Sequence, residues 1–246
     1  MITLRAFRAV DDYDTCEKFM LGHRAVLENI GVSKLSSAKD EWMVSPAVFV
    51  IIVESEDRSK VYGGARVHVV DGKLQLPIEE ATGYLDDRIY GIVKEHAVTG
   101  TGEICGLWNS REVAGMGIGS VFLTRACVII SSQICLQSLF ALCAPYTIKM
   151  AQSVGYHIID HIGKNGTFYY PKLDLVATAM ILDDVKTLKL ADEEEREKIM
   201  SLRTNLQQVR KELLRGKEIE LDFHLEIANL DAWYASGIIK NLIKDA

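Results

Sequence analysis

The chain has 246 residues, and its 28 Lys and Arg against 34 Asp and Glu give a formal net charge of −6. Hydrophobic residues make up 48% and charged residues 25%, which is ordinary for a globular protein and excludes a disordered, collagen-like or disulfide-rich chain. The sequence contains no block of five or more basic residues, so it does not predict a nucleic-acid-binding protein.

The cysteines and the apolar stretches indicate in which compartment the protein is expected and whether a membrane span is expected. The five cysteines are scattered without a CxxC pair, so neither a metal site nor a disulfide framework is expected. Reduced cysteines and an N-terminus that carries charges from Arg5 onward predict a cytoplasmic protein without a signal peptide. The most apolar stretch, 121–144, includes an arginine and several Ser and Gln residues, so no membrane span is predicted.

Residues 1–186 are expected to form the main domain, in which strands and helices are mixed. Apolar–polar alternation and β-branched runs predict strands at 2–7, 47–54, 61–70, 102–109, 138–144, 156–162 and 176–182. Capping residues, Pro and Gly predict helices from Asp11 or Asp12 to Gly31, at 120–132 and at 145–155. Helical character is mixed at 84–97, and 32–46 predicts a loop or a short helix. Asp71-Gly72 predicts a hairpin turn between the strand 61–70 and the segment KLQL.

The remaining residues, 187–246, are expected to form a C-terminal appendage of helix, strand and helix. Apolar residues from Ile199 to Leu213 step by three and four, which predicts an amphipathic helix of about six turns. Residues 219–227 alternate apolar with charged side chains and predict a strand, and 230–243 predict a last helix. We expect the appendage to pack on the main domain or on a second subunit, which would make a homodimer.

The segment most informative about function is the glycine-rich turn 114–119, between a predicted strand and a predicted helix. Alternating glycines let successive backbone N–H groups turn toward one point at a helix N-terminus, where a pyrophosphate is favoured. A Walker loop would need Lys and then Ser or Thr after the last glycine. A dinucleotide fingerprint would need an early position in the chain and an acidic residue about 20 positions on. The sequence has neither pattern.

This strand–loop–helix segment resembles motif A of the GNAT acyltransferase superfamily, in which a Gln/Arg-x-x-Gly-x-Gly loop binds the pyrophosphate of coenzyme A. Gly117 and Gly119 match the two glycines, and Ala114 stands where the family has Gln or Arg. The order of predicted elements also matches over residues 1–183, down to the closing pair Gly155-Tyr156. The resemblance implies an α/β (α+β) fold with a mixed, mostly antiparallel central sheet flanked by helices.

A narrower resemblance involves two segments. Residues 103–107 (EICGL) are similar to the Glu-Ile-Ser-Arg-Phe strand of acyl-homoserine-lactone and N-acyl amino acid synthases, and residues 76–79 (LPIE) are similar to a Leu-Pro-Leu-Glu stretch of that branch. Gly106 replaces the arginine of the branch, so the chemistry of the branch is not carried over.

The family resemblance implies that the chain binds acetyl-CoA or another acyl-CoA. The strand end that pairs with the pantetheine arm, together with the loop, gives the expected binding residues: Leu107, Trp108, Asn109, Ala114, Gly115, Met116, Gly117, Ile118, Gly119 and Ser120. Trp108 is interpreted as a wall of the cofactor or substrate channel rather than as a catalyst, with a core residue as the alternative. Arg111 and Arg125 are candidate phosphate contacts, with a solvated surface position as the alternative for each.

The candidate catalytic residues are Glu103 and Tyr146. Glu103 matches a family position at the start of the strand, and it would take the proton of an attacking amine; burial would raise its pKa toward a useful value. A structural Glu paired with a basic side chain is the alternative. The family's general acid is a Tyr where this chain has Ala151, and Tyr146 lies one to two turns upstream as a substitute. Cys105 is more plausible as a core residue than as a nucleophile.

The sequence therefore predicts an acyl-CoA-dependent N-acyltransferase that transfers an acyl group, in the first place acetyl, directly to a small-molecule amine or amino-acid-like acceptor. A long-chain acyl transferase using acyl carrier protein or a fatty acyl-CoA is one alternative. A non-catalytic acyl-CoA-binding or assembly protein is the other, because the family's residues are missing at positions 114 and 151. Residues 163–170 predict either a lid on the acceptor side or an ordinary loop.

Overall fold

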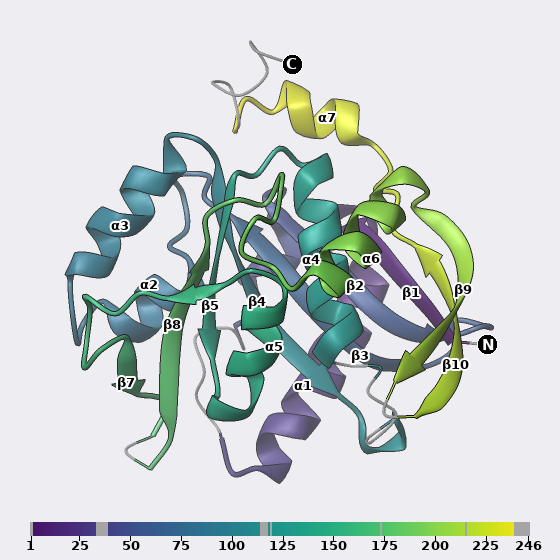
Figure 1. Ribbon diagram of the computed structural model, residues 1–246, viewed down its shortest axis with the longest axis horizontal. Coiled ribbons are helices and arrows are strands. Elements are labelled where there is room, and N and C mark those ends of the chain that lie inside the picture. The colour runs from purple at the N-terminus through teal and green to yellow at the C-terminus, as the bar shows by residue number, and fades with distance from the viewer. Residues whose placement is uncertain are drawn as a thin grey trace.

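The chain builds one mixed β-sheet with helices on both of its faces (Figure 1). This computed structural model describes residues 2–32, 39–113, 118, 120–172, 174–214 and 216–238. The strands are β1 (Ile2–Arg8), β2 (Val48–Ser55), β3 (Val61–Val69), β4 (Thr101–Asn109), β5 (Ser138–Cys143), β6 (His157–Ile158), β7 (Thr167–Tyr169), β8 (Val176–Leu182), β9 (Gln207–Leu214) and β10 (Lys217–His224). The helices are α1 (Tyr13–Asn29), α2 (Pro77–Thr82), α3 (Arg88–Ala97), α4 (Ser120–Gln133), α5 (Ile148–Ser153), α6 (Glu193–Thr204) and α7 (Leu230–Ala235).

The strand order is β6-β8-β5-β4-β3-β2-β1-β10-β9, with β7 also paired to β8. The pairs β4–β5 and β1–β10 are parallel, and the other described pairs are antiparallel. Short 3-10 helices lie at Ala9–Asp11, Glu41–Val44, Arg111–Val113 and Pro145–Thr147. The predicted α/β class and the mixed, mostly antiparallel sheet are confirmed.

The central strands are buried on both faces, which explains their continuous apolar runs. Phe49 and Ile51 of β2 belong to the core beneath α4, whereas the alternating Val50 and Ile52 belong to the core beneath α1. Figure 1 shows α4, α5 and α6 in front of the sheet and α1 behind it. A third cluster packs α2 and α3 against β5 and β8.

The first helix begins and ends where the sequence predicts. The Asp12 side chain accepts a hydrogen bond from the backbone N–H of Thr15 at the N-terminus of α1. At its other end Gly31 adopts a left-handed φ of +69°, and the N–H of Val32 donates to the carbonyl of Leu27. These two caps satisfy backbone groups that the helix itself leaves unpaired.

The predicted hairpin at Asp71-Gly72 is wrong. The β3 strand ends at Val69, and the Asp71 carboxylate instead accepts hydrogen bonds from the N–H groups of Lys73 and Leu74. Lys73, Leu74 and Gln75 are exposed, and Leu76 is buried as the residue that precedes α2, so the segment KLQL forms no strand with a buried face. The antiparallel partner of β3 on that side is β4, which comes after α2 and α3.

The part of the sheet beyond β5 is also more irregular than predicted. The strand expected at 156–162 is reduced to β6, His157–Ile158. Residues 163–170, expected as a lid or loop, include β7, which pairs with β8 from Thr167 opposite Thr178 to Tyr169 opposite Val176. Part of that segment therefore belongs to the sheet.

The predicted six-turn helix through Leu213 is wrong. The helix α6 ends at Thr204, and β9 then runs antiparallel to β10. Ile199 and Leu202 of the apolar stripe are buried, whereas Val209 and Leu213 are exposed on the strand. Residues 207–214 (QQVRKELL) do not alternate apolar and polar side chains, so no local pattern indicates a strand; the backbone of β10 provides the hydrogen bonds that stabilise it.

The C-terminal segment is joined to the main sheet, because β10 pairs with β1 in parallel from Ile2 opposite Leu221 to Arg5 opposite His224. The Trp233 ring is fully buried and lies edge-on to Phe49 at 5.0 Å. The division of the chain at residue 186 and the homodimer remain predictions.

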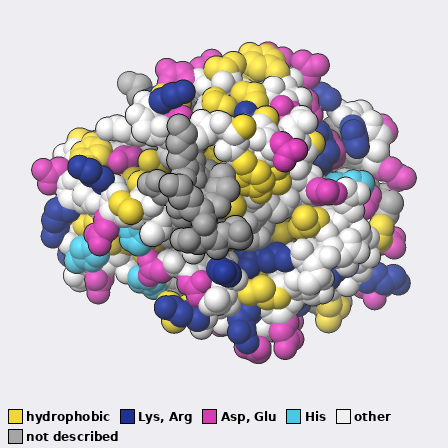
Figure 2. All heavy atoms as spheres, turned by 90° about the horizontal axis from the view of Figure 1, so that it is seen from above, with side chains coloured by type: hydrophobic (Ala, Val, Ile, Leu, Met, Phe, Trp, Pro, Cys, Tyr) yellow, Lys and Arg dark blue, Asp and Glu magenta, His cyan; other side chains and the backbone are white. Residues whose placement is uncertain are grey.

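Figure 2 shows the molecule from above. On the face seen there, acidic and basic side chains are interspersed.

Candidate functional site

Strands β4 and β5 form a fork. Their parallel pairing runs from Thr101 opposite Ser138 to Ile104 opposite Ala141, and β4 then continues to Asn109. Among the described residues, the ladder between these two strands ends at Ile104. The second half of β4 therefore presents backbone groups on a side where β5 does not pair with them.

A β-bulge lies at this fork. Gly64 of β3 pairs with Trp108, whereas Arg66 pairs with Cys105, so two residues of β4 stand opposite the single residue between them. One of these two, Gly106, has a left-handed φ of +58°, which glycine adopts without strain. A bulge bends its strand and increases the twist, and it thereby separates the end of β4 from β5.

Glu103 lies on β4 just before the fork and is only 2% exposed. Its Oε2 accepts a hydrogen bond of 2.7 Å from the backbone N–H of Ile78, near the start of α2. Burial raises the pKa of the Glu103 carboxyl to about 8, and the hydrogen bond from Ile78 opposes that rise. The two segments similar to the synthase branch, 76–79 and 103–107, are therefore in direct contact at this carboxyl.

Beside Glu103, polar side chains gather on the sheet face covered by α1 and α2. Strand register places Arg66 opposite Cys105 and His68 opposite Glu103, so all four share one face. Burial raises the pKa of the Cys105 thiol to about 12, which makes it a poor nucleophile at neutral pH. This supports the interpretation of Cys105 as a core residue.

Arg66 and His68 were missed as site residues, although the sequence carries a signal for them. In the run VYGGARVHVV the apolar positions Ala65, Val67 and Val69 alternate with Arg66 and His68. Charged or titratable residues at alternate positions of a central strand must share one buried face, so they are candidates for function as well as for structure.

The expected donor-binding residues at the end of β4 have different surroundings. Leu107 is half-buried against the core on the α4 side. The Trp108 ring is buried against α1, at 5.8 Å from Phe19, and a Cβ on Gly22 would lie 2.0 Å from it. The Trp108 ring is therefore a core residue, and its backbone is the part that lies at the fork. Asn109 ends the strand and is half-buried.

Most of the glycine-rich loop, Ala114, Gly115, Met116, Gly117 and Gly119, lies outside the described residues. Its flanks are described: the 3-10 helix Arg111–Val113 follows β4, and α4 begins at Ser120. Ile118 is fully buried in the core. In the chain, the loop therefore comes after the end of β4 and directly before α4.

The two tyrosines near the fork have opposite environments. Tyr146, the candidate general acid, is 85% exposed on the 3-10 helix that follows β5. Ala151 is buried on α5. Tyr156 is buried, its hydroxyl has no partner among the described residues, and burial raises its pKa well above the usual value. Of the two, only Tyr146 is accessible to solvent.

Arg125 was expected as a phosphate contact or as a solvated surface residue, and both expectations are wrong. Its guanidinium is 2% exposed and donates two hydrogen bonds to Glu195 of α6, at 3.1 and 3.0 Å, while Glu212 of β9 lies 3.3 Å away. The sequence could not indicate this, because both carboxylates come from the segment after residue 186. Arg111 is exposed, as the surface alternative predicts.

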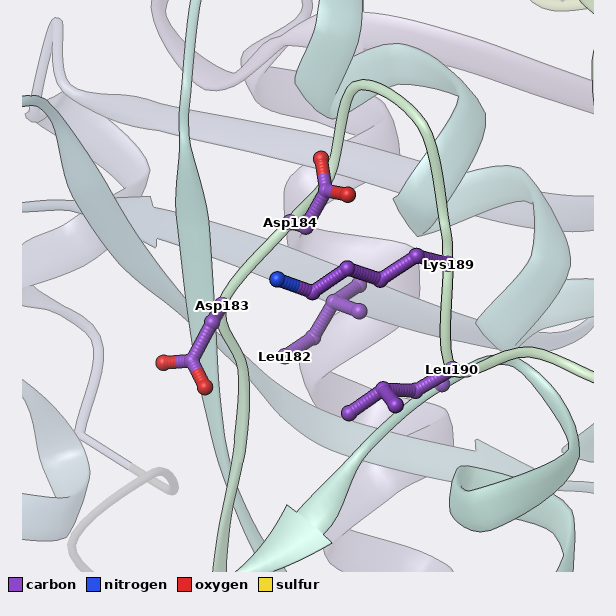
Figure 3. A pocket seen from close by; sticks show the side chains of 6 residues that line it. Leu182, Asp183, Asp184, Lys189 and Leu190 are labelled. Carbon is purple, nitrogen blue, oxygen red and sulfur yellow. The ribbon is translucent and has the colours of Figure 1, made fainter.

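One small pocket outside the fork is described, with an empty volume of about 170 Å³. Figure 3 shows the side chains of Asp183 and Asp184 pointing to opposite sides of the segment after β8, with Lys189 reaching toward it. Within the described ranges, no group of three or more His, Cys, Asp and Glu side chains is placed to hold a metal ion. No described helix is both long and apolar enough to cross a bilayer.

Comparison with known proteins gives a clear result for the fold alone. No family model matches the sequence, and no curated protein matches it significantly. Among solved structures, the chain is similar to FeeM, an N-acyl amino acid synthase from uncultured soil microbes, with a TM-score of 0.58 at 13% identity, over 80% of this chain and 98% of that chain.

Two further structures are similar at about the same level. BjaI, a CoA-dependent acyl-homoserine lactone synthase, gives a TM-score of 0.51 at 11% identity over 83% of this chain and 90% of its own. An acyl-CoA N-acyltransferase from Pseudomonas aeruginosa gives 0.50 at 10% identity over 74% of this chain and 99% of its own. The chain therefore has a GNAT-like fold.

Proposed function

We propose that this chain is an acyl-CoA-dependent N-acyltransferase that transfers an acyl group directly to an amine. The observation that carries the proposal is the fork between β4 and β5, where the pairing ends at Ile104 beside the buried carboxyl of Glu103. An open strand edge can pair with the amide groups of an extended ligand, as an added strand would. The pantetheine arm of coenzyme A has two such amides in line with its thiol.

The donor would lie along the second half of β4. Backbone groups of Leu107, Trp108 and Asn109 would pair with the pantetheine arm. The backbone amides of residues 115–120, at the N-terminus of α4, would hold the pyrophosphate, because unpaired N–H groups and the helix dipole both favour an anion there. This arrangement needs no Lys or Arg, which agrees with the net charge of −6.

The reaction joins the amine nitrogen to the thioester carbonyl carbon. As the C–N bond forms, one N–H proton passes to the Glu103 carboxylate; the C–S bond then breaks, and the coenzyme leaves as a thiolate that takes up a proton. The pKa of about 8 makes Glu103 a stronger base than an ordinary carboxylate, at the cost of a smaller ionised fraction at neutral pH. Tyr146 is the proposed proton donor to the thiolate, since its exposed hydroxyl lies on the segment that follows β5.

Calorimetry with acetyl-CoA tests the donor site directly. We expect saturable binding, with release of free thiol when a panel of amines is added. Glu103→Gln should keep donor binding and lose thiol release, since the amide still accepts the hydrogen bond from Ile78 but cannot take a proton. Absence of binding at millimolar acetyl-CoA and at millimolar long-chain acyl-CoA would overturn the proposal.

The same assay identifies which acyl group the chain transfers. We propose acetyl first, and turnover of fatty acyl-CoA or of acyl carrier protein, with none of acetyl-CoA, would assign a long-chain transferase instead. Donor binding without thiol release across the amine panel would assign a non-catalytic acyl-CoA-binding protein. The acceptor proposed is a small-molecule amine or amino-acid-like compound.

A further inference from the structure

The two ends of the sheet differ in how much strand edge they present. At one end, β6 and β7 are only two and three residues long. At the other end, β9 is eight residues long, and Figure 1 shows it at the outer border of the sheet. Among the described residues, β9 pairs with β10 on one side and with no strand on the other. A long edge strand offers unpaired N–H and C=O groups to a further strand.

One face of β9 is directed toward helices of its own chain. Arg210 Nη2 donates a hydrogen bond of 2.6 Å to Ser201 Oγ of α6, and Glu212 Oε2 lies 3.3 Å from Arg125 Nη1 of α4. The other hydrogen bond of the Arg210 guanidinium goes to Gln208, so both of its partners in the described part of the chain are uncharged. This face of β9 therefore carries a cation and an anion two residues apart.

The other face of β9 is exposed, although two of its side chains are apolar. Val209 is 50% exposed, and Leu213 is 73% exposed, more than any other described leucine. Lys211 lies between them, and its Nζ is 2.9 Å from a carboxylate oxygen of Glu218 on β10. Single apolar side chains are common on protein surfaces. Val209 and Leu213, however, are placed symmetrically, two residues before and two residues after Lys211.

This symmetry fits a second copy of the chain. In a two-fold antiparallel pair of identical strands, residue i of one copy stands opposite residue j of the other, and residue j opposite residue i. With the axis at Lys211, Val209 stands opposite Leu213 of the second copy on the exposed face. On the face toward the helices, Arg210 stands opposite Glu212 of the second copy. Each of these pairs occurs twice, so apolar groups meet apolar groups and cations meet anions.

The neighbouring two-fold registers lack this complementarity. An axis at Arg210 would set the two Arg210 side chains opposite each other, and an axis at Glu212 would do the same for Glu212. Like charges directly opposite each other are destabilising. An axis at Lys211 also brings two cations together, but each of them has a carboxylate of its own chain, since the hydrogen bond to Glu218 raises the pKa of Lys211 and Glu220 adds to that rise.

We propose that this chain forms a two-fold homodimer in which β9 pairs antiparallel with β9 of a second copy, with Lys211 at the axis. The two sheets then join into one continuous sheet, and the unpaired backbone groups of both edges are satisfied. A strand of unrelated sequence would not match both the apolar pairs and the charge pairs, so the partner that fits is this chain itself. The dimer does not depend on the proposed acyl transfer.

Sedimentation velocity of the full chain over a concentration series tests the dimer. We expect a species with twice the chain mass of 27.5 kDa. The double variant Val209→Lys, Leu213→Lys should lose this species, because it replaces the apolar pairs by further cations beside Lys211. Leu21→Lys is the matched control, since Leu21 is 67% exposed on α1, and it should keep the dimer.

Disulfide formation between copies tests the register. Lys211→Cys places the new thiol opposite itself, with the two Cβ atoms about 4.5–5.5 Å apart, close to the separation at which a disulfide forms. Val209→Cys is the control on the same face, because its thiol would lie about 13 Å along the strand from its copy. After mild oxidation, non-reducing gel electrophoresis should show a covalent dimer for Lys211→Cys and little for Val209→Cys.

A chain that stays monomeric up to millimolar concentration would overturn the proposal and would assign the charges of β9 to protecting the edge from pairing. A dimer that persists in the folded double variant, or equal cross-linking of Lys211→Cys and Val209→Cys, would also overturn it. If near-ultraviolet circular dichroism shows that the double variant does not fold, the wild-type mass and the cross-linking decide. Calorimetry with acetyl-CoA tests the proposed function separately, so either proposal can fail without the other.

Discussion

Arg66 and Arg125 are both almost completely buried, and they have different surroundings. Arg125 on α4 is held by the carboxylates of Glu195 and Glu212, and both of these belong to the C-terminal segment. Arg66 at the fork lies on two aromatic rings, near a carboxyl whose pKa is raised. The comparison shows that one buried cation is held by carboxylates from a distant segment of the chain, whereas the other packs against aromatic rings beside the bulge of β4.

Removing the proposed catalytic base, Glu103, should give the largest effect on activity. Glu103→Gln should lower kcat by about 10²–10⁴-fold, because a positioned general base contributes about that much. The dissociation constant of the acyl-CoA should stay the same, since Gln still accepts the hydrogen bond from Ile78.

Glu79→Gln is the matched control for that change. It lies on α2 beside the same carboxyl but hydrogen-bonds to the backbone N–H of Leu76. Stopped assays of thiol release with each variant give the comparison, and an equal loss of activity in both would contradict the assignment of Glu103.

Arg125→Met should lower the free energy of unfolding by about 3–5 kcal/mol, because it leaves the buried Glu212 without its cation and Glu195 with only Lys198, at 3.6 Å. Denaturant unfolding measures this loss. The triple variant that also replaces Glu195 and Glu212 by leucine should recover most of it.

Donor binding at the fork should survive in any of these variants that folds, since Arg125 does not contact the end of β4. A loss of acyl-CoA affinity in the folded triple variant would contradict the separation of the two regions.

The pH dependence of the free energy of unfolding should distinguish Glu103 at the fork from the ion pairs of Arg125. The Glu103 pKa is about 8 in the folded chain and 4.5 as its ordinary value, so between these pH values the folded state keeps a proton that the unfolded state has lost. Unfolding then releases a proton, and stability falls as pH rises from about 4.5 to about 8, by a few kcal/mol in all.

Glu103→Gln should remove that slope, and Glu79→Gln should not. Chemical denaturation at a series of pH values measures it. A wild-type free energy of unfolding no more pH-dependent in this window than that of Glu103→Gln would contradict a neutral Glu103.

The smallest effect concerns the bulge. Gly106→Ala should destabilise the chain by about 1–2 kcal/mol through its left-handed φ, and by more through the approach of a Cβ to the Arg66 guanidinium. Gly72→Ala is the control, since Gly72 has a φ of +75° and no atom within 4 Å of an added Cβ. Thermal unfolding of both should show a larger loss at Gly106, together with weaker acyl-CoA binding.

Much of the fold could be predicted from the sequence because its signals are local. The strand at 102–109, the glycine-rich turn and the helix from Ser120 follow from β-branched runs, glycines and capping residues, and the structure places β4 and α4 there. The contact between the segments 76–79 and 103–107 agrees with their common resemblance to one branch of the family.

The features that the sequence did not reveal depend on contacts between distant residues. Residues 207–214 have no strand pattern of their own, and pairing with β10 makes them a strand. The partners of Arg125 lie 70 and more residues away, so no local pattern could indicate them.

Residue types and short-range spacing determined the mixed α/β class and the position of the glycine-rich turn in the chain, and the resemblance to the family then indicated Glu103 as the candidate base. The register between β3 and β4 decided which polar side chains stand beside that base, because alternation along a strand says which residues share a face but not which strand lies next to it. The raised pKa of Glu103 likewise required the packed core, since desolvation depends on every neighbour that excludes water.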